Sequence, residues 1–211
     1  MIPIESLIMF IAASALLAVV PGPDNLFVLT QSAIHGRAAG VMVTLGLCSG
    51  LIVHTSAVAL GVAAIFQTSA VAFTVLKVIG AAYLVYLAVR AFQASADSVE
   101  LKRQASRSLG ALYRRGIFMN ITNPKVSIFF LAFLPQFIAP EKGEFTLQVF
   151  MLGGIFMLVA LAILCVIALL AAFLGRWLNR SPGAQIYLNR VAGVVFMGLA
   201  LKLVTSKAMP S

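Results

Sequence analysis

The most informative part of the chain is Pro21-Gly22-Pro23-Asp24, which interrupts a long apolar run close to the N-terminus. A proline inside a helix lacks a backbone donor and clashes with the preceding turn, so we expect the helix to break here. A later apolar run repeats the arrangement with a charge of opposite sign, as Asn123-Pro124-Lys125. Charges at membrane depth are costly, so both are expected to line a cavity, pair with each other or lie on a substrate path.

The composition identifies a protein of the lipid bilayer. Of the 211 residues, 62% are hydrophobic and 10% are charged, and the mean hydropathy is +1.06. A membrane crossing takes about 20 apolar residues, so the chain has room for roughly six helices and for no soluble catalytic domain. The net charge of +9 is attributed to cytoplasmic loops, and no nucleic-acid partner is expected.

The apolar runs predict an all-α integral membrane protein with six transmembrane helices in a single transmembrane domain, residues 1–211. A β-barrel is excluded because the runs are long and lack the period-two alternation of barrel strands. The predicted spans run from about Glu5 to Ser32, Gly40 to Ile65, Ala70 to Phe92, Tyr113 to Phe137, Thr146 to Phe173 and Tyr187 to Ser206.

Basic residues set the expected orientation. Ten of the 15 Lys and Arg residues fall on the side of the first, third and fifth connections. Cytoplasmic loops collect Lys and Arg, so these connections are expected in the cytoplasm and both termini outside. No Lys or Arg precedes Arg37, unlike the basic start of a cleaved signal peptide, so Met1 is expected to be retained.

The two halves of the chain look like copies. The stretch from Lys77 to Leu84 matches that from Arg190 to Met197 in basic, glycine and aromatic positions, and the two proline motifs occupy corresponding places. We expect repeat one at about 1–92, a basic cytoplasmic loop at 93–112 and repeat two at about 113–211. Because each repeat has three spans, the second must enter the membrane upside down, with substrate near the midplane.

The two breaks define the predicted substrate site. Lys125 follows Arg115, at the expected membrane rim, by ten residues, which is roughly 15 Å of helix and half of the hydrocarbon thickness. A zwitterionic amino acid can place its ammonium on Asp24 and its carboxylate on Lys125 or on half-helix amides. The alternative is an ion pair of Asp24 and Lys125 that only holds the broken helices together. The predicted substrate-binding residues are Gly22, Asp24, Asn25, Thr122, Asn123 and Lys125, and the helix-breaking residues are Pro21, Pro23 and Pro124.

His54 is a second candidate for proton coupling, beside Asp24, because histidine exchanges protons near neutral pH. The alternative is a packed, hydrogen-bonded histidine. On the same predicted helix, Gly46 and Gly50 predict a close helix–helix contact. Both cysteines, Cys48 and Cys165, lie in apolar segments, and the chain has no phosphate-binding loop, zinc-protease helix or nucleophile elbow, so no metal, cofactor or enzymatic activity is expected.

Taken together, Pro21-Gly22-Pro23-Asp24-Asn25, the stretch from Gly46 to His54, and Asn123-Pro124-Lys125 resemble the LysE/RhtB family of amino-acid exporters. The similarity runs over essentially the whole chain. It implies export of homoserine, threonine, leucine or similar amino acids across the bacterial inner membrane, driven by the proton gradient. The implied partners are a small amino acid, protons and the lipid bilayer.

Two alternatives to an amino-acid exporter stay open at this stage. The same polar midplane could serve as the constriction of a passive pore, and an exporter could carry another zwitterionic metabolite. A membrane enzyme or scaffold is disfavoured because no metal or nucleophile constellation is present. Small-residue faces on the second and fifth helices permit a homodimer without requiring one.

Overall fold

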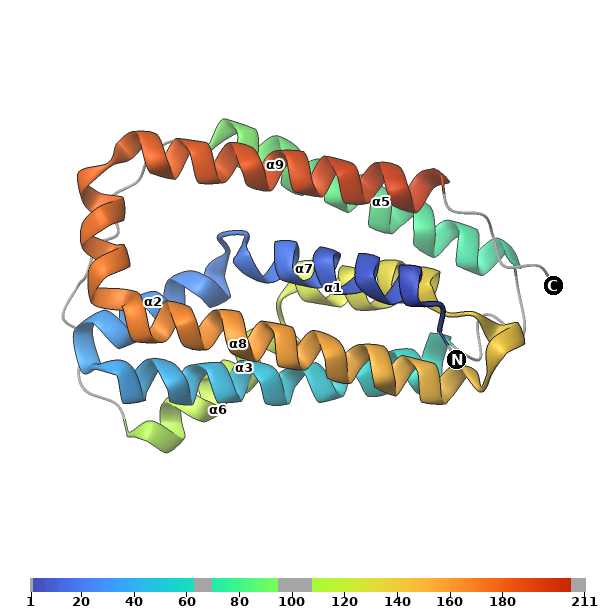
Figure 1. The fold of residues 1–211 in the computed structure, drawn as a ribbon, viewed down its shortest axis with the longest axis horizontal. Coiled ribbons are helices and arrows are strands. Elements are labelled where there is room, and N and C mark those ends of the chain that lie inside the picture. The colour runs from blue at the N-terminus through green and yellow to red at the C-terminus, as the bar shows by residue number, and fades with distance from the viewer. Residues whose placement is uncertain (1, 63–69, 95–107, 206–211) are drawn as a thin grey trace.

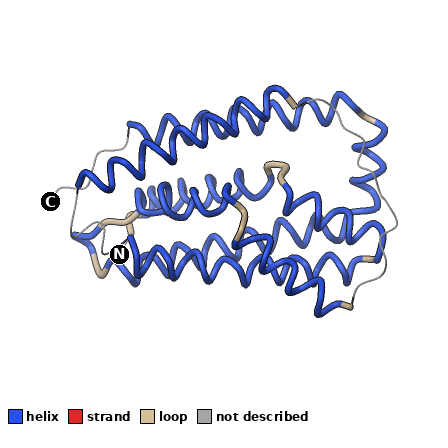
Figure 2. The backbone as a smooth tube through the Cα atoms, turned by 180° about the vertical axis from the view of Figure 1, so that it is seen from behind, coloured by secondary structure: helices blue, strands red, loops and turns tan. Residues whose placement is uncertain are grey.

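The computed structural model describes residues 2–62, 70–94 and 108–205, and within these ranges it is helical, without a β-strand (Figure 2). Four helices are long and apolar enough to cross a membrane, and there are six spans when each of two bent helix pairs counts as one. The predicted fold class is therefore confirmed. Most of the predicted basic loop lies outside the described residues.

The helical elements follow one another as two similar series, each made of a broken span and two long helices. The first series contains α1 (Ile4–Val19), α2 (Pro23–His35), α3 (Arg37–Ala57) with the π-helical turn η1 (Val58–Val62), and α5 (Ala70–Gln93). The second contains α6 (Leu109–Ile121), α7 (Pro124–Ile128), η2 (Phe129–Phe133), η3 (Leu134–Phe137), η4 (Pro140–Lys142), α8 (Phe145–Arg180) and α9 (Pro182–Thr205).

Both predicted helix breaks are present. The axis turns by 57° between α1 and α2 and by 49° between α6 and the segment Pro124–Phe137. Pro23 and Pro124 each stand in the first turn of the new half-helix, where the amide that proline lacks would have no intrahelical partner. The breaks thus divide each of these spans into two half-helices (Figure 1).

Three predicted boundaries differ from the structure by four residues or more. Helix α6 begins at Leu109, before the predicted Tyr113, because the Ser108 hydroxyl accepts a hydrogen bond from the amide of Ala111 and caps the helix. Helix α9 begins at Pro182 and not at Tyr187, again because proline suits a first turn. Helix α8 continues to Arg180, past the predicted Phe173, since a helix can extend beyond its apolar run.

Glycines let α3 and α6 approach closely, as predicted for Gly46 and Gly50. A side chain at Gly46 would overlap the backbone carbonyl of Tyr113, and one at Gly50 would meet Asn120. Gly116 on α6 faces the backbone of α3 in the same way. The prediction of a close helix contact is confirmed, and it holds α6 in a fixed position at the second break.

Helices α5 and α9 lie side by side, apart from the main bundle of α1, α2, α3, α6 and α8 in both ribbon views (Figures 1 and 2). The segment η2 lies between this pair and the bundle: Gly80 of α5 has no room for a side chain against Ala132 of η2. On α9, the Lys202 ammonium stands 4.2 Å from the centre of the Phe137 ring. The second broken span therefore contacts both layers.

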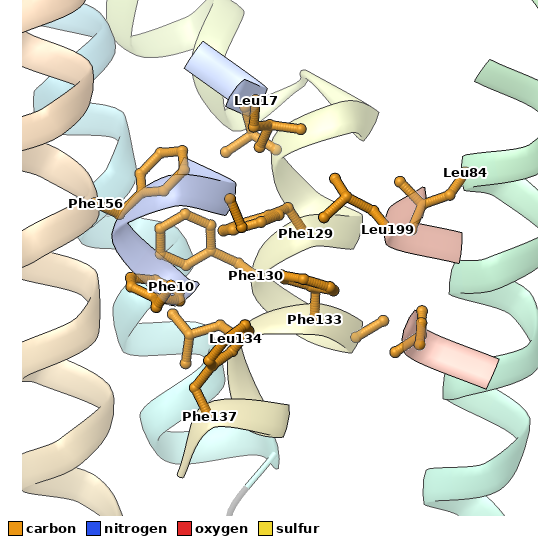
Figure 3. Close-up of a cluster of buried hydrophobic side chains, with 14 of the residues drawn as sticks. Phe10, Leu17, Leu84, Phe129, Phe130, Phe133, Leu134, Phe137, Phe156 and Leu199 are labelled. Carbon is orange, nitrogen blue, oxygen red and sulfur yellow. The ribbon is translucent and has the colours of Figure 1, made fainter. Parts of the chain in front are cut away.

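Two buried clusters fill the bundle on either side of the breaks. The aromatic cluster contains Phe10, Phe129, Phe130, Phe133, Phe137 and Phe156, on the side where α1 begins (Figure 3). The aliphatic cluster contains Val28, Ala39, Val43, Leu47, Leu112, Leu164 and Ala168, on the side where α2 ends. The polar residues at the breaks lie between these clusters.

Candidate functional site

The first break frees backbone carbonyls that side chains then satisfy. In a continuous helix, the carbonyls of Leu17 and Val19 would accept from the amides of residues 21 and 23, which are both prolines. The Lys125 ammonium donates instead to the carbonyls of Leu17 at 3.0 Å and Val20 at 3.1 Å. The end of α1 is therefore bound by a cation from the second half of the chain, which also suits the helix dipole.

The amide of Asn25 completes this cap from the other side of the break. Its Nδ2 donates to the carbonyl of Ala18 at 2.7 Å and lies 3.5 Å from that of Val19. Asn25 stands in the first turn of α2, so it connects the two half-helices directly. Because buried carbonyls are costly without a donor, this contact stabilises the broken conformation.

Asn123 joins the second break to the first. It is the N-cap of α7, where its Oδ1 accepts from the amide of Lys125 at 3.0 Å. Its Nδ2 donates to Asp24 Oδ2 at 2.8 Å. A single amide side chain thus caps one half-helix and binds the carboxylate at the start of another.

The ion pair between Asp24 and Lys125, which the sequence left open as the alternative to a substrate site, is not formed. Both residues are described, and within the described part of the chain their charged groups make no contact of ion-pair length; Asn123 and the α1 carbonyls are their partners instead. The physical reason is that Pro21 and Pro23 leave strong acceptors close to the ammonium. The two charges nevertheless line one cavity.

This cavity lies between the aromatic and aliphatic clusters at the level of the breaks. It offers about 30 Å³ to the centre of a water molecule, enough for one or two waters. Its polar walls are Asp24, Asn25, Asn120 and Lys125. Its apolar walls are Leu17, Ala18, Leu47, Cys48, Leu51, Val126, Phe156, Ala160 and Leu164. A bound amino acid would require the walls to move apart.

The cavity walls retain unused hydrogen-bonding capacity. Asp24 is 8% exposed and Asn120 3% exposed, and the Oδ1 atom of each is buried without a partner. The Lys125 ammonium has three N–H groups, of which two bind the α1 carbonyls. The site can therefore accept hydrogen bonds from a cationic group and donate one to an anionic group.

Asn120 was not predicted from the sequence. A single asparagine in an apolar helix carries little signal, although its position three residues before Asn123 places both on one helix face. The structure brings it to the cavity from the last turn of α6. Its backbone carbonyl accepts from the Asn123 amide at 3.0 Å and from His54 Nε2 at 3.1 Å.

The remaining predicted residues lie around this group. Gly22 is the N-cap of α2, and a Cβ there would stand 3.4 Å from the Lys125 ammonium nitrogen. His54 is buried, and its ring centre lies 5.6 Å from that of Phe130. Thr122 is exposed, and its hydroxyl donates to the carbonyls of Phe118 at 2.8 Å and Met119 at 3.3 Å. Thr122 is therefore not brought to the cavity with the others.

Packed side chains from both buried clusters line the cavity. On the aromatic side, Phe156 lines the cavity, and its ring centre lies 5.2 Å from that of Phe129 and 5.1 Å from that of Phe130 (Figure 3). On the aliphatic side, Leu47 and Leu164 both line the cavity and belong to the cluster. Between α2 and α6, the Arg115 guanidinium stands 4.9 Å from the centre of the Phe27 ring.

Metal coordination finds no support in the described residues: no three His, Cys, Asp or Glu side chains come together there as ligands. Cys48 and Cys165 are both free thiols. The polar chemistry of the site therefore consists of a carboxylate, an ammonium and amides.

Two interrupted spans that meet around a small cavity with polar groups are typical of helical membrane transporters of the broken-helix class. A comparison with family models makes this more specific: the model described as LysE type translocator matches residues 15–207. The chain belongs to this family, so the predicted resemblance is confirmed.

Curated relatives agree with this assignment. The chain is 33% identical over 199 residues to the homoserine/homoserine lactone efflux protein of Salmonella typhimurium, covering 94% of this chain and 95% of that protein. It is 32% identical over 199 residues to an uncharacterized membrane protein of Vibrio cholerae, covering 94% and 96%. The membrane protein YrhP of Bacillus subtilis is 28% identical over 207 residues, covering 94% and 98%. No solved structure matches the chain.

Proposed function

We propose that the protein exports small amino acids or close derivatives, such as homoserine, through the cavity between its two broken spans, in exchange for protons. The single observation that carries this proposal is Asp24, a buried carboxylate at the junction of both breaks with one oxygen bound by Asn123 and the other free. Such a carboxylate is costly in a membrane span unless it serves a ligand or a proton.

The names of the relatives indicate which substrate group matters most. The Salmonella protein is named for homoserine and homoserine lactone. Homoserine and its lactone share an α-ammonium group, while the lactone has lost the carboxylate charge to an internal ester. A free carboxylate oxygen at Asp24 suits the shared ammonium, and the third N–H of Lys125 suits the carboxylate that only homoserine carries.

Competition for Asp24 gives a simple physical basis for exchange. The Asp24 carboxylate can bind an ammonium through a charge-assisted hydrogen bond or can carry a proton, and protonation removes the negative charge that attracts the ammonium. Release of substrate and uptake of a proton are then alternative occupancies of one group, which is the requirement for antiport. His54, whose ring binds the backbone carbonyl of Asn120, is a neighbouring candidate for the proton path.

The small volume of the cavity implies a change of shape during transport. It holds one or two waters, so the half-helices must separate to admit an amino acid. The breaks supply the hinges, since α1 and α2 are joined by side-chain contacts and not by a continuous backbone ladder. With the orientation expected from the basic residues, the aromatic cluster closes the periplasmic side of a bacterial inner-membrane protein with both termini outside.

The test is transport of labelled homoserine by the purified protein in proteoliposomes with an imposed proton gradient. Asp24→Asn should reduce transport by at least tenfold while the protein remains inserted and folded. Glu5→Gln, which neutralises an exposed carboxylate in the first turn of α1, is the matched control and should transport normally.

Two results would contradict the proposal. Unchanged transport by Asp24→Asn would remove the carboxylate from the mechanism. Flux that neither saturates nor shows counterflow would indicate a passive pore instead of an exchanger.

A further inference from the structure

We propose that Asn120 is a second ligand of the transported ammonium group. Asp24 and Asn120 together select a primary ammonium because it has enough N–H donors to bind both acceptors. This inference rests on the proposed function and deepens it, because it assigns the chemical class of the cargo to two named acceptors. Neither the family assignment nor the names of the relatives assigns a role to this residue.

The first observation is that Asn120 carries an unsatisfied acceptor. Its side chain is 3% exposed, and its Oδ1 has no hydrogen-bond partner. A buried amide oxygen without a donor is unfavourable, and packing alone would be served better by an apolar residue of similar size. An acceptor kept open in this way indicates that a ligand supplies the missing donor.

The second observation is that the two open acceptors belong to one cavity. Asp24 and Asn120 both line it, from the first turn of α2 and the last turn of α6. The Asn120 amide also lies beside the Asp24 carboxylate. Two residues that line the same small volume therefore each carry an Oδ1 atom without a partner.

The third observation is that the surrounding structure holds Asn120 in place. Its backbone carbonyl accepts hydrogen bonds from the His54 ring and from the backbone N–H of Asn123. Gly50 provides the space for its side chain, because a Cβ at Gly50 would lie 2.7 Å from Asn120 Cβ and 2.8 Å from Oδ1. A positioned amide is what a selective binding site needs.

The chemistry of the ligand follows from the number of open acceptors. A primary ammonium has three N–H groups, so it can donate to Asp24 and Asn120 simultaneously. One N-methyl group leaves two donors, and two N-methyl groups leave one. All three ions carry the same charge, so methylation changes the donor count without removing the attraction of the carboxylate.

The experiment measures inhibition of labelled homoserine transport in proteoliposomes by unlabelled homoserine, N-methylhomoserine and N,N-dimethylhomoserine. For the wild-type protein we expect the dimethyl compound to bind about tenfold more weakly than homoserine, the effect of losing one hydrogen bond to a charged group. Asn120→Ala should weaken the binding of homoserine by a similar factor and the binding of the dimethyl compound only slightly. The ratio of their inhibition constants should therefore approach one.

Controls separate a ligand role from a structural one. Asn120→Ser, which keeps an acceptor, should recover part of the discrimination. Asn189→Ala makes the same substitution on α9, away from the cavity, and should leave the discrimination unchanged. Because the readout is a ratio of inhibition constants within each variant, it does not depend on how much folded protein is recovered.

The outcomes for this inference and for the proposed function are distinguishable. Transport that is intact in the wild-type protein and sensitive to Asp24→Asn, but with equal discrimination in wild type and Asn120→Ala, would overturn the role of Asn120 alone. Absence of saturable homoserine transport in the wild-type protein would overturn both proposals.

Discussion

The two interrupted spans satisfy their broken backbones in different ways. At the first break, the carbonyls of α1 are bound by Asn25 and by Lys125, which lies 108 residues after its acceptor Leu17. At the second break, Asn123 caps the helix that follows it, and the Ser127 hydroxyl donates to the Asn123 carbonyl at 3.1 Å. The first break therefore depends on the second, while the second is largely self-sufficient.

This difference separates the roles of the two charges at the breaks. Two of the three N–H groups of the Lys125 ammonium bind backbone carbonyls of the first break, so its first role is to hold the end of α1 in place. Asp24 keeps one oxygen free, so its capacity for a ligand or a proton is retained. The sequence suggested a symmetric pair of charges, and the structure replaces it with one organising cation and one chemically open anion.

The largest effect is expected from Lys125→Met, which removes the cation that binds the carbonyls of the first break. The substitution keeps the length of the side chain but leaves the carbonyls of Leu17 and Val20 without donors. At 1–3 kcal/mol for each orphaned acceptor, the free energy of unfolding should fall by about 2–6 kcal/mol. Thermal unfolding of the detergent-purified protein and homoserine transport measure the two consequences.

Lys202→Met is the matched control for this substitution. Lys202 is also a lysine of a membrane-spanning helix, but its ammonium stands against the Phe133 and Phe137 rings. Lys202 is half-buried, and loss of such a contact costs up to about 2 kcal/mol. Equal destabilisation by the two substitutions would show that Lys125 does not organise the first break.

A smaller effect is expected from Asn123, the residue that joins the two breaks. Asn123→Ser keeps a capping oxygen for α7 but removes the donor to Asp24, so it should cost about 1.5–3 kcal/mol and reduce transport. Asn123→Ala removes the cap as well and should cost about 1 kcal/mol more. The difference in stability between the two variants, measured by thermal unfolding, gives the contribution of the Asn123 cap to α7 at the second break.

Transport by these variants tests the bridge itself. If Asn123→Ser transports like the wild type, the hydrogen bond to Asp24 is not needed to position the carboxylate. Such a result would leave the two breaks as neighbours without functional coupling.

The breaks were predictable because their cause is local. Proline removes a donor and glycine allows a turn wherever they occur, so Pro21, Gly22 and Pro23 mark the first break without any knowledge of the fold. The expected membrane depth of Lys125 rests on helix rise alone and stays a prediction. The close approach of α3 and α6 followed in the same way from Gly46 and Gly50.

The partners of the polar groups were not predictable, because they depend on tertiary competition. Opposite charges suggested an ion pair, yet the carbonyls freed at the first break lie within reach of the Lys125 ammonium and bind it. Asn120 gave no periodic signal, and its place in the cavity wall is visible only where α6 meets the cavity. Sequence reasoning thus identified most of the residues that meet at the candidate site, but not the hydrogen bonds between them.

The smallest effect is expected from Thr122, which follows α6 directly at the second break. The sequence placed Thr122 in the substrate site, but its exposed hydroxyl donates to the carbonyls of Phe118 and Met119 in its own helix. Thr122→Val keeps the shape and removes the hydroxyl, and exposed substitutions of this kind change stability by about 0.5 kcal/mol or less. Homoserine transport should keep the KM of the wild type. An increase of tenfold with unchanged stability would mean that Thr122 turns into the cavity during transport, and the second break would then be chemically open as well.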